Sequence, residues 1–489
     1  MNLKYRIFSS LMAIALLSTA MISCGGNSTG PGVNTDAIAQ TTDITAVTET
    51  ADLGPTPTLP EGADYGGYTV KFLTLTNYNH NFRLAVESDG ETLNDAGARR
   101  NAAISDLLNI EFEAVEMDSP VSKFKSSIMA GDTEYDFMLP HATDGVPQLV
   151  TSHLLYDWNN LEYVDLTKPW WNTSMTTSLG IGGHLFYASG DIVMTWQGMM
   201  AILFNKSYLA GMELEKDLYE TCFDGEWTID YMAQIIKGHS KDLNGDGKMT
   251  NVDQYGLLDN KNAGYVYMYS ADQRVTVPDA DGWPTLTLNT ERMAEIVGKY
   301  YNLIHSGETY LDIYSNASYP TSTYRNTIVE GRAFLATLDV GGLYAQLREI
   351  EFDFGLLPMP KFDEAQESYR VFCGAGLIGV PSNVPDPART SVIAEALAYY
   401  SYKEIRPAFF DIVLENKAVR EENAYKVLQM MHENKVFDFG FNFDSNGYNI
   451  ITDVVVNKKS TDFASAYAKK EKAILKSFEK IITAVKELE

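Results

Sequence analysis

Strand-like runs alternate with helical runs along most of the chain, and this alternation is the feature that most constrains the fold. The run YTVKFLTL, which begins at Tyr68, predicts a strand that ends in the polar loop TNYNHN. The next stretch, ETLNDAGARRNAAISDLLN, places apolar residues on one helical side, and IEFEAVE predicts a second strand. DFMLP, HLFYAS, MAILFN, AFLATL, DFGLLP and GLIGVP continue the series. Such alternation favours parallel sheets with helices on both faces, an α/β fold.

The length of the chain predicts more than one sheet. It has 489 residues, of which 45% are hydrophobic, so it can bury a large core. The part from residue 65 onward is too long for one doubly wound sheet of ordinary size, and we expect two lobes. The last stretch, KAILKSFEKIITAVKELE, has one apolar stripe at helical spacing and predicts a helix that docks on the core.

The N-terminus has the form of an export signal. Lys4 and Arg6 precede a short apolar run that ends at Cys24, and the run is shorter than the membrane span of about 20 residues that a spanning helix needs. The residues Met21-Ile22-Ser23-Cys24 resemble a bacterial lipobox, which implies cleavage after residue 23 and lipid on Cys24. A plain secretory signal with a chance cysteine is the alternative. With the lipid, we expect a protein anchored on the extracellular face of the cytoplasmic membrane, without a spanning segment.

The segment that follows the signal predicts a flexible linker over residues 24–64. From Gly25 to Gly62 it contains no Lys, no Arg and no aromatic residue, so it cannot bury a core. The whole chain carries a net charge of −27, which argues against binding to nucleic acid or anionic lipid headgroups. Besides Cys24, the cysteines are Cys222 and Cys373. They could form one disulfide or stay as two buried free thiols.

Several stretches, taken in order, resemble the family 1 extracellular solute-binding proteins, the maltose-binding-like receptors of ABC importers. They are YDFMLPHATDGVPQLVTSHLLYDWNNL, GGHLFYASGDIVMTWQGMMAILFNKSYL, GEWTIDYMAQIIKGHSKDLNGDGK, and FLATLDVGG with FDFGLLPMPKFDEAQ. The resemblance covers about residues 65–489 and implies two doubly wound α/β lobes with hinge crossings, as in type II periplasmic-binding proteins. We expect lobe 1 over 65–190 and 340–403, and lobe 2 over 191–339 and 404–489.

The resemblance also implies a function. A receptor of this kind closes its lobes on a ligand, the closed state signals to the permease subunits of an ABC importer, and no covalent chemistry is needed. We therefore expect a monomeric receptor that is not an enzyme, with a small carbohydrate ligand and a permease as partners. A polyamine or a peptide is the alternative ligand for an acidic, aromatic cleft.

The candidate ligand-binding residues follow from strand positions, because ligands bind outside the carboxyl ends of strands in open parallel sheets. Amides and carboxylates suit sugar hydroxyls, and aromatic rings pack on the pyranose face. Core packing is the alternative for the tryptophans, and helix capping for the polar residues. The candidates are Asn77, Tyr78, His141, Thr143, Asp144, Asp191, Trp196, Asp339 and Tyr344, with Trp170, Trp171 and Trp283 as further aromatic residues.

The stretch DLNGDGKMTNVD has the spacing of a calcium loop. Asp242, Asn244 and Asp246 stand at positions 1, 3 and 5, Lys248 offers its carbonyl at 7, and Asp253 stands at 12. It resembles EF-hand and dockerin loops, although no helix pattern follows it. We expect a structural Ca²⁺ ion here. A turn closed by its own aspartates, without metal, is the alternative.

Two enzyme signatures, HExxH and the P-loop, are absent from the sequence, and no two histidines are three or four residues apart. With 65 acidic residues, a pair of carboxylates at glycosidase spacing carries no weight. A surface glycan hydrolase and a tethered capture protein without a permease are the alternatives to a transport receptor.

Overall fold

Two sheets carry the fold in the computed structural model, which describes residues 54–143, 145–312, 323–342, 350–374, 376–415 and 422–488. Both sheets belong to one unit, Gly54–Glu489. The predictions for the signal peptide, for Cys24, and for the ligand residues Asp144 and Tyr344 lie outside the described residues. So does most of the predicted linker. Its described end is tied to the fold, because Leu59 and Ala63 pack against the core.

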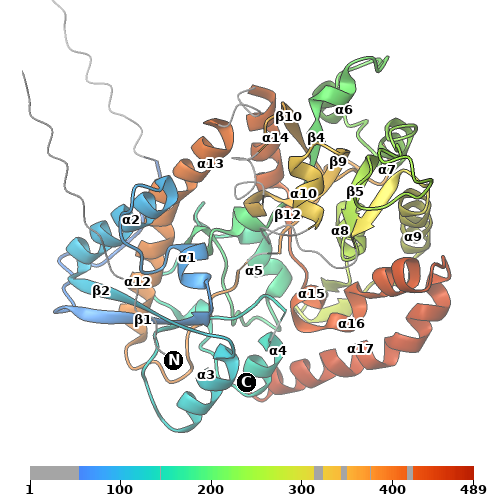
Figure 1. Cartoon of the computed structure of the whole chain (residues 1–489). Coiled ribbons are helices and arrows are strands. Elements are labelled where there is room, and N and C mark those ends of the chain that lie inside the picture. Colours follow the sequence, from blue (N-terminus) through green and yellow to red (C-terminus); the bar gives the residue numbers. More distant parts are fainter. Residues whose placement is uncertain are drawn as a thin grey trace, which may run out of the picture. The chain divides into compact units, whose positions relative to one another are not determined.

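The first sheet has the strand order β2–β1–β3, with both pairs parallel. Figure 1 shows β1 and β2 side by side. The strands are β1 (Tyr68–Leu75), β2 (Ile110–Met117) and β3 (Phe137–Leu139). Two more segments, which contain the predicted strands GLIGVP and HLFYAS, join this sheet. The bridges are Met138 with Gly379 and Ala188 with Ile378. Strand β1 is buried, with Val70, Phe72 and Leu73 fully inaccessible to solvent. Helices therefore cover the sheet, as the β-branched and apolar residues of this run predicted.

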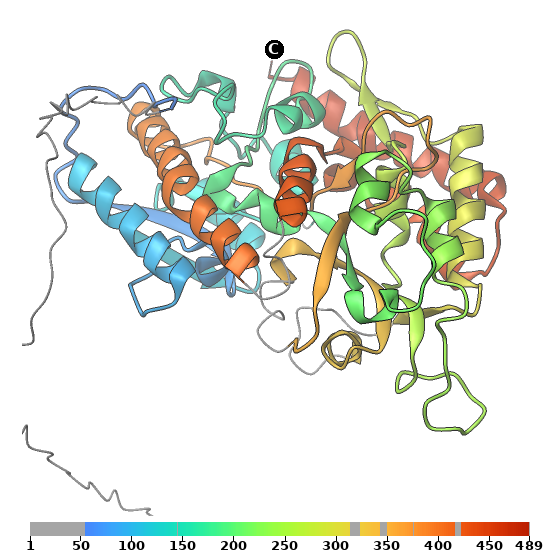
Figure 2. The ribbon, with the colours of Figure 1, turned by 90° about the horizontal axis from the view of Figure 1, so that it is seen from above.

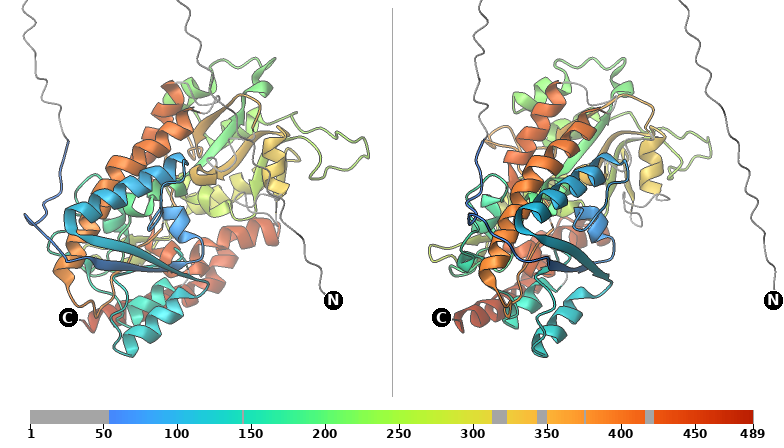
Figure 3. Two further views of the ribbon diagram at one scale, coloured as in Figure 1. Left: turned by 60° about the vertical axis from the view of Figure 1, so that its left-hand side comes forward. Right: turned by 90° about the vertical axis from the view of Figure 1, so that its left-hand side faces the viewer.

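Helices from both ends of the sequence cover this sheet. Arg100 of α2 is buried and donates to Ser401 Oγ at 3.0 Å, which ties α2 to the π-helical turn η6. In Figures 2 and 3 the α12–η6–α13 segment lies beside α2. The helices of this lobe are α1 (Tyr78–Phe82), α2 (Thr92–Leu108), α3 (Pro120–Met129), α4 (Val146–Thr151), α5 (Thr173–Leu179), α12 (Pro387–Tyr400), η6 (Ser401–Ile405) and α13 (Arg406–Glu415), with the short 3₁₀ turn η1 (Trp158–Asn160).

The second sheet has the order β10–β4–β9–β5–β8. It is mixed: β4 runs antiparallel to β9 and β10, while β5 runs parallel to β8 and β9. β4 is antiparallel because the chain enters this sheet from the other lobe, through the crossing that contains η2 (Asp191–Val193) and η3 (Thr195–Gly198). The strands are β4 (Met200–Asn205), β5 (Tyr255–Asn260), β8 (Thr309–Asp312), β9 (Ala333–Asp339) and β10 (Phe354–Pro358).

The lobe boundaries differ from those expected. β10 falls within residues 340–403, which we assigned to lobe 1, but it hydrogen-bonds to β4 in the second sheet. α13 falls within 404–489, assigned to lobe 2, but it packs against α2 of the first lobe. The chain therefore crosses between the lobes later than the strand pattern alone indicated, because a run such as DFGLLP does not specify which sheet it joins.

The second lobe contains the remaining elements. α9 begins at an N-cap threonine, where Thr290 Oγ1 accepts from Met293 N at 3.0 Å. The elements are η4 (Lys206–Leu209), α6 (Leu218–Phe223), α7 (Ile229–Ile235), α8 (Gly264–Ser270), β6 (Thr276–Pro278), β7 (Pro284–Leu286), α9 (Glu291–Ile304), α10 (Thr323–Val329), β11 (Val371–Phe372), α14 (Glu422–Glu433), β12 (Lys435–Val436), α15 (Phe439–Phe443), α16 (Ser445–Tyr448), η7 (Thr452–Asn457) and α17 (Phe463–Lys486).

The C-terminal helix α17 contacts both lobes (Figure 1). It packs on α9 and α16 of the second lobe, and Lys470 forms an ion pair with Asp453 of η7. Near its end it packs on α4 of the first lobe, where His153 Nε2 lies 2.8 Å from the Ala484 carbonyl oxygen. The predicted helix is present and begins earlier, at Phe463. Within the described part of the chain, no helix combines the length and apolarity needed to cross a membrane.

Candidate functional site: a cleft between the two sheets

A cleft of about 640 Å³ lies where segments of both lobes meet. The first lobe contributes α1, which follows β1, and the loop that follows β3. The second lobe contributes α8, the end of β9, β11 and α15. The crossing between η2 and β4 also lines it. The side chains that line the cleft include Tyr78, His80, Phe82, Arg83, His141, Gln197, Tyr265, Asp339, Phe372 and Phe441.

The wall from the first lobe is formed by a tight single-turn helix. Residues with left-handed backbone bracket α1, since Asn77 has φ 73° and Arg83 has φ 52°. The rings of Tyr78 and Phe82 meet edge to face at 4.8 Å, and burial raises the pKa of Tyr78 to about 12. Tyr78 is therefore a neutral hydroxyl that can donate a hydrogen bond into the cleft.

Polar groups border this wall. The Arg83 guanidinium donates to the carbonyl oxygens of His80 and Asn81, so it helps to hold the turn. His141, after β3, is exposed, and its Nδ1 lies 3.1 Å from Thr143 Oγ1. The polar loop after β1 and the loop after β3 thus meet at one sheet edge, as the parallel order of β1 and β3 requires.

The wall from the second lobe is aromatic. The ring of Phe372 meets those of Tyr265 and Phe441 at centroid distances of 5.2 and 4.8 Å, both edge to face. Behind it, Tyr269 stacks on Phe372 at 5.0 Å. Tyr265 and Tyr269 are one turn apart on α8, so the helix presents both rings on one side. This cluster forms an apolar surface against which a flat ligand ring can pack.

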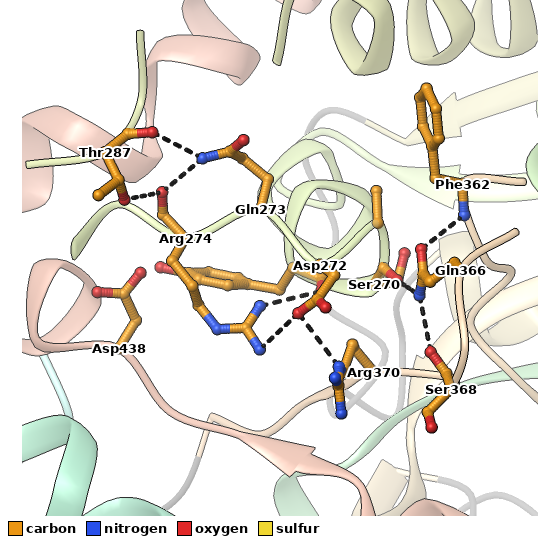
Figure 4. A network of polar contacts seen from close by, with 12 residues as sticks. Ser270, Asp272, Gln273, Arg274, Thr287, Phe362, Gln366, Ser368, Arg370 and Asp438 are labelled. Atoms are coloured by element: carbon orange, nitrogen blue, oxygen red, sulfur yellow. Dashed lines mark hydrogen bonds and ion pairs between the residues drawn. The ribbon is translucent and has the colours of Figure 1, made fainter. Parts of the chain in front are cut away.

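A polar network holds the aromatic wall in place (Figure 4). Asp272, just after α8, forms ion pairs with Arg274 and Arg370, each at 3.1 Å. The Gln366 side chain donates to the carbonyl oxygen of Ser270, the last residue of α8, at 2.8 Å. Because Arg370 directly precedes β11, the network fixes the end of α8 relative to β11 and so fixes the rings that they carry.

Asp339 places a carboxylate in the cleft at the end of β9. Its Oδ1 accepts from Gly342 N at 2.5 Å, and burial raises its pKa above the ordinary value. A Cβ at Gly342 would lie 3.2 Å from both carboxylate oxygens, so the glycine allows the backbone to approach this closely. Where it is ionised, the carboxylate can accept hydrogen bonds from ligand hydroxyl or ammonium groups.

The structure brings three of the expected ligand residues into the cleft: Tyr78, His141 and Asp339. Thr143 lines an adjoining cavity instead. Asn77 stands at the N-cap position of α1, where its side chain makes no capping hydrogen bond, and it is absent from the lining of the cleft. Trp283 lies on the β6–β7 hairpin, where its ring packs against Gly182 and under Lys486, at 4.8 Å from the ammonium group.

Trp170 and Trp171 are core residues, so their expected place in the cleft is corrected. Both are almost fully buried, and their indole N–H groups donate to the two carboxylate oxygens of Glu395, at 3.0 and 2.8 Å. Glu395 is itself buried on α12, and burial raises its pKa. The tandem tryptophans thus anchor the loop of residues 165–171 to α12. Their sequence gave no sign of this because the partner is more than 220 residues away.

Asp191 and Trp196 are also placed differently from our expectation. Both lie in the crossing and are buried, and the Trp196 indole donates to Asp191 Oδ1 at 3.0 Å. The Arg406 guanidinium of α13 pairs with the same carboxylate, and its Nε donates at 3.0 Å. Asp191 therefore joins the crossing to the first lobe and does not line the cleft.

Several lining residues were missed as candidates: Phe82, Arg83, Gln197, Tyr265, Phe372 and Phe441. The spacing of Tyr265 and Tyr269 on a helix was readable, but an aromatic pair at that spacing usually indicates core packing. Phe372 and Phe441 come together only through the parallel pairing of β11 with β12, and no local pattern reports that pairing.

The loop of residues 242–253 is closed by its own side chains. Asp242 accepts from Gly245 N and Gly247 N at 2.7 and 2.8 Å, and Asp246 accepts from Lys248 N at 2.8 Å. Asp253 is buried and accepts from Leu243 N and Thr250 N. In this conformation the described residues contain no cluster of three or more acidic, histidine or cysteine side chains arranged to bind a metal. The oxygen ligands, including Asn244 and the Lys248 carbonyl, are nevertheless of the type that calcium prefers.

The two cysteines of the folded part are free and buried. Burial raises the pKa of both thiols to about 12, so neither is a reactive thiolate near neutral pH. Cys373, next to the cleft wall, donates to the Thr195 carbonyl oxygen at 3.0 Å.

The comparison with solved structures decides the fold. The galacto-N-biose/lacto-N-biose I-binding protein of an ABC transporter from Bifidobacterium longum, in complex with lacto-N-biose, is 12% identical with a TM-score of 0.57, over 85% of this chain and 98% of that one. The chain has the fold of the ABC-importer solute-binding proteins. The resemblance in the sequence predicted this fold, including the two α/β lobes.

Two further solute-binding-fold structures are similar to this chain. The GacH receptor of Streptomyces glaucescens, solved unliganded and with acarbose, is 12% identical with a TM-score of 0.53, over 84% of this chain and 99% of that one. UgpB from Mycobacterium tuberculosis, in complex with glycerophosphocholine, is 14% identical with a TM-score of 0.53, over 85% and 99%. No protein-family model and no curated protein sequence matches the chain.

Proposed function

We propose that this protein is the substrate-binding receptor of an ABC importer, and that its cleft binds a sugar or an oligosaccharide without catalysing a reaction. The observation that carries the proposal is the pairing of surfaces across the cleft. Rings of Tyr265, Phe372 and Phe441 form one wall, and hydrogen-bonding groups of Asp339 and His141 border it. A pyranose has an apolar face and a hydroxyl edge, which suit these two surfaces.

Ligand binding would act through the arrangement of the lobes. A sugar that contacts Tyr78 of the first lobe and Phe372 of the second stabilises the arrangement in which both contacts exist. The permease can recognise that arrangement, so binding becomes a signal without covalent chemistry. Two of the similar proteins were solved with lacto-N-biose and with acarbose, which supports a saccharide as the ligand class.

The proposal includes the location of the receptor. Lipid on Cys24 would hold it at the extracellular face of the cytoplasmic membrane, and the linker would let it reach the permease. It also includes a structural Ca²⁺ ion in the 242–253 loop, held by oxygen atoms of Asp242, Asn244, Asp246, Lys248 and Asp253. The ion would lock this loop of the second lobe and would take no part in ligand binding.

A ligand screen tests the proposal. Purified protein is assayed by thermal shift and then by calorimetry against mono- and oligosaccharides, polyamines and short peptides. We expect binding of a saccharide, and a loss of about tenfold or more in affinity for Asp339→Asn, since a hydrogen bond to a charged group contributes about 1.5–3 kcal/mol. Asp106→Asn, an exposed change on the outer side of α2, is the matched control. A response to polyamines or peptides alone would overturn the saccharide assignment.

A further inference from the structure

The outer side of the C-terminal helix α17 carries a straight row of lysines. We name it the lysine row, and it consists of Lys469, Lys472, Lys476 and Lys480. These residues are three or four positions apart, so they lie on one side of the helix and extend over about 16 Å of its axis. All four are exposed, whereas Ile474 and Phe478 are buried on the opposite side against the core. The row therefore faces solvent along the edge of the molecule where Figure 1 shows α17.

The lysine row makes no ion pair that would hold the fold. Two other lysines of α17 do contribute to packing: Lys470 forms an ion pair with Asp453, and the Lys486 ammonium lies 4.8 Å from the centroid of the Trp283 ring. Within the described part of the chain, no ion pair joins a lysine of the row to a carboxylate. Four positive charges therefore face solvent, and the fold does not account for their alignment.

The charge of α17 is opposite to that of the chain as a whole. The net charge of −27 argues on its own against binding to anionic headgroups, but α17 contains six lysines and two glutamates. Glu471 is half-buried and accepts from the Tyr467 hydroxyl at 2.8 Å, so Glu479 is the exposed carboxylate of this helix. Charges are screened over about 8 Å at physiological ionic strength. A surface that meets α17 therefore interacts with the lysine row and not with the acidic remainder.

The composition of the row favours a lipid surface over a protein partner. Contact surfaces between proteins are enriched in arginine and aromatic residues and depleted of lysine. The row contains neither arginine nor an aromatic ring, and lysine is a flexible, strongly hydrated point charge that suits a fluid layer of anionic headgroups. Leu475, three positions from Lys472, is 47% exposed beside the row. An apolar side chain next to lysines can enter the boundary between headgroups and acyl chains.

We infer that the lysine row docks α17 on the anionic lipid headgroups of the membrane that the receptor faces. Each lysine close to an anionic surface strengthens the attraction about fivefold, so four together strengthen it roughly several hundredfold. The proposed lipid on Cys24 would keep the row near the membrane, which makes weak docking sufficient. Because α17 packs on both lobes, docking through it would give the receptor a preferred orientation. The inference rests on the proposed location at the membrane and not on the solute that binds in the cleft.

The experiment is co-sedimentation with lipid vesicles. The chain from residue 24 onward, with Cys24→Ser, is used so that neither the signal segment nor a lipid contributes. We expect it to bind vesicles of phosphatidylcholine mixed with phosphatidylglycerol, to bind pure phosphatidylcholine far less, and to dissociate as salt is added. The combined variant should bind the mixed vesicles about a hundredfold or more weaker. It carries Lys469→Gln, Lys472→Gln, Lys476→Gln and Lys480→Gln, which keep helix propensity and should leave the circular dichroism unchanged.

The matched control removes the same charge from other parts of the surface. It replaces four exposed lysines of other segments, Lys237→Gln, Lys261→Gln, Lys403→Gln and Lys426→Gln. The control should bind the mixed vesicles nearly as tightly as the wild type. Equal losses in both variants would overturn the inference, because they would show a response to net charge alone, and so would a wild type that does not bind the mixed vesicles. Binding of the wild type to polyglutamate but not to vesicles would also overturn it, in favour of an acidic protein partner.

Discussion

Removing one partner of the ion pair between Asp191 and Arg406 should strongly destabilise the crossing between the lobes. Asp191 is 2% exposed, and its carboxylate accepts from Trp196 and from the Arg406 guanidinium. Asp191→Asn keeps the shape and an acceptor for the indole. It removes the charge, so the Arg406 guanidinium, whose side chain is 16% exposed, is left without its counter-charge.

The expected cost follows from that burial. Breaking a buried ion pair by removing one partner destabilises a protein by about 3–5 kcal/mol. Arg406 keeps some contact with solvent and also donates to the Pro169 carbonyl oxygen, so we expect the lower end, about 3 kcal/mol. Arg406→Gln should cost a similar amount. The double variant should cost clearly less than the sum, because the second change removes a charge that the first left unpaired.

The assay is urea unfolding of the four proteins, followed by tryptophan fluorescence and circular dichroism. Single-variant effects that add within about 0.5 kcal/mol would refute the reasoning, since they would show that the two groups do not interact. Saccharide affinity of Asp191→Asn, measured well below its melting temperature, should equal that of the wild type. A large loss of affinity in the folded variant would instead return Asp191 to the binding site.

Three further predictions concern other parts of the chain. Burial raises the pKa of Asp259 to about 8, from 3.8 in the unfolded chain. Between these two pH values the folded state holds one proton more than the unfolded state. The free energy of unfolding therefore falls as the pH rises through this range, by up to about 1.4 kcal/mol per pH unit. Urea unfolding from pH 5 to 8 should show a shallower slope for Asp259→Asn, and an unchanged slope would contradict the assignment. Calcium should raise the melting temperature, and Asp242→Asn should abolish the rise; equal melting temperatures in calcium and in chelator would remove the ion from the proposal. Cys24→Ser should move the protein from the membrane fraction to the soluble fraction of expressing cells, whereas retention in the membrane would argue against the lipid anchor.

The sequence predicted the class of the fold because its local patterns are strong. The run at 68–75 forms β1 and the run at 110–116 lies in β2, and the helix between them carries its apolar residues on the buried side. The polar loops after β1 and β3 were identified as candidate ligand loops from strand order alone. Tyr78 and His141 are in the cleft because the carboxyl ends of parallel strands meet at one sheet edge.

The tryptophans show where local reasoning stops. An indole suits a sugar face and a protein core equally well, and its sequence neighbours do not distinguish the two uses. The indoles of Trp170 and Trp171 donate to Glu395 of α12, and the ring of Trp196 packs on Phe409 of α13, so other elements provide their surroundings. The aromatic wall of the cleft is instead made by Tyr265, Phe372 and Phe441, which had no ligand signature of their own.

The sequence by itself therefore determined the alternation of strands and helices, the expectation of two lobes, and which strand ends could face a ligand. Only the tertiary structure decided that β10 joins the second sheet, which rings form the cleft, and that α17 encloses a second cavity with α4. The physical reason is the range of the interactions. Periodicity and turn chemistry act between residues a few positions apart, whereas the binding surface is assembled from segments that meet only when both sheets have formed.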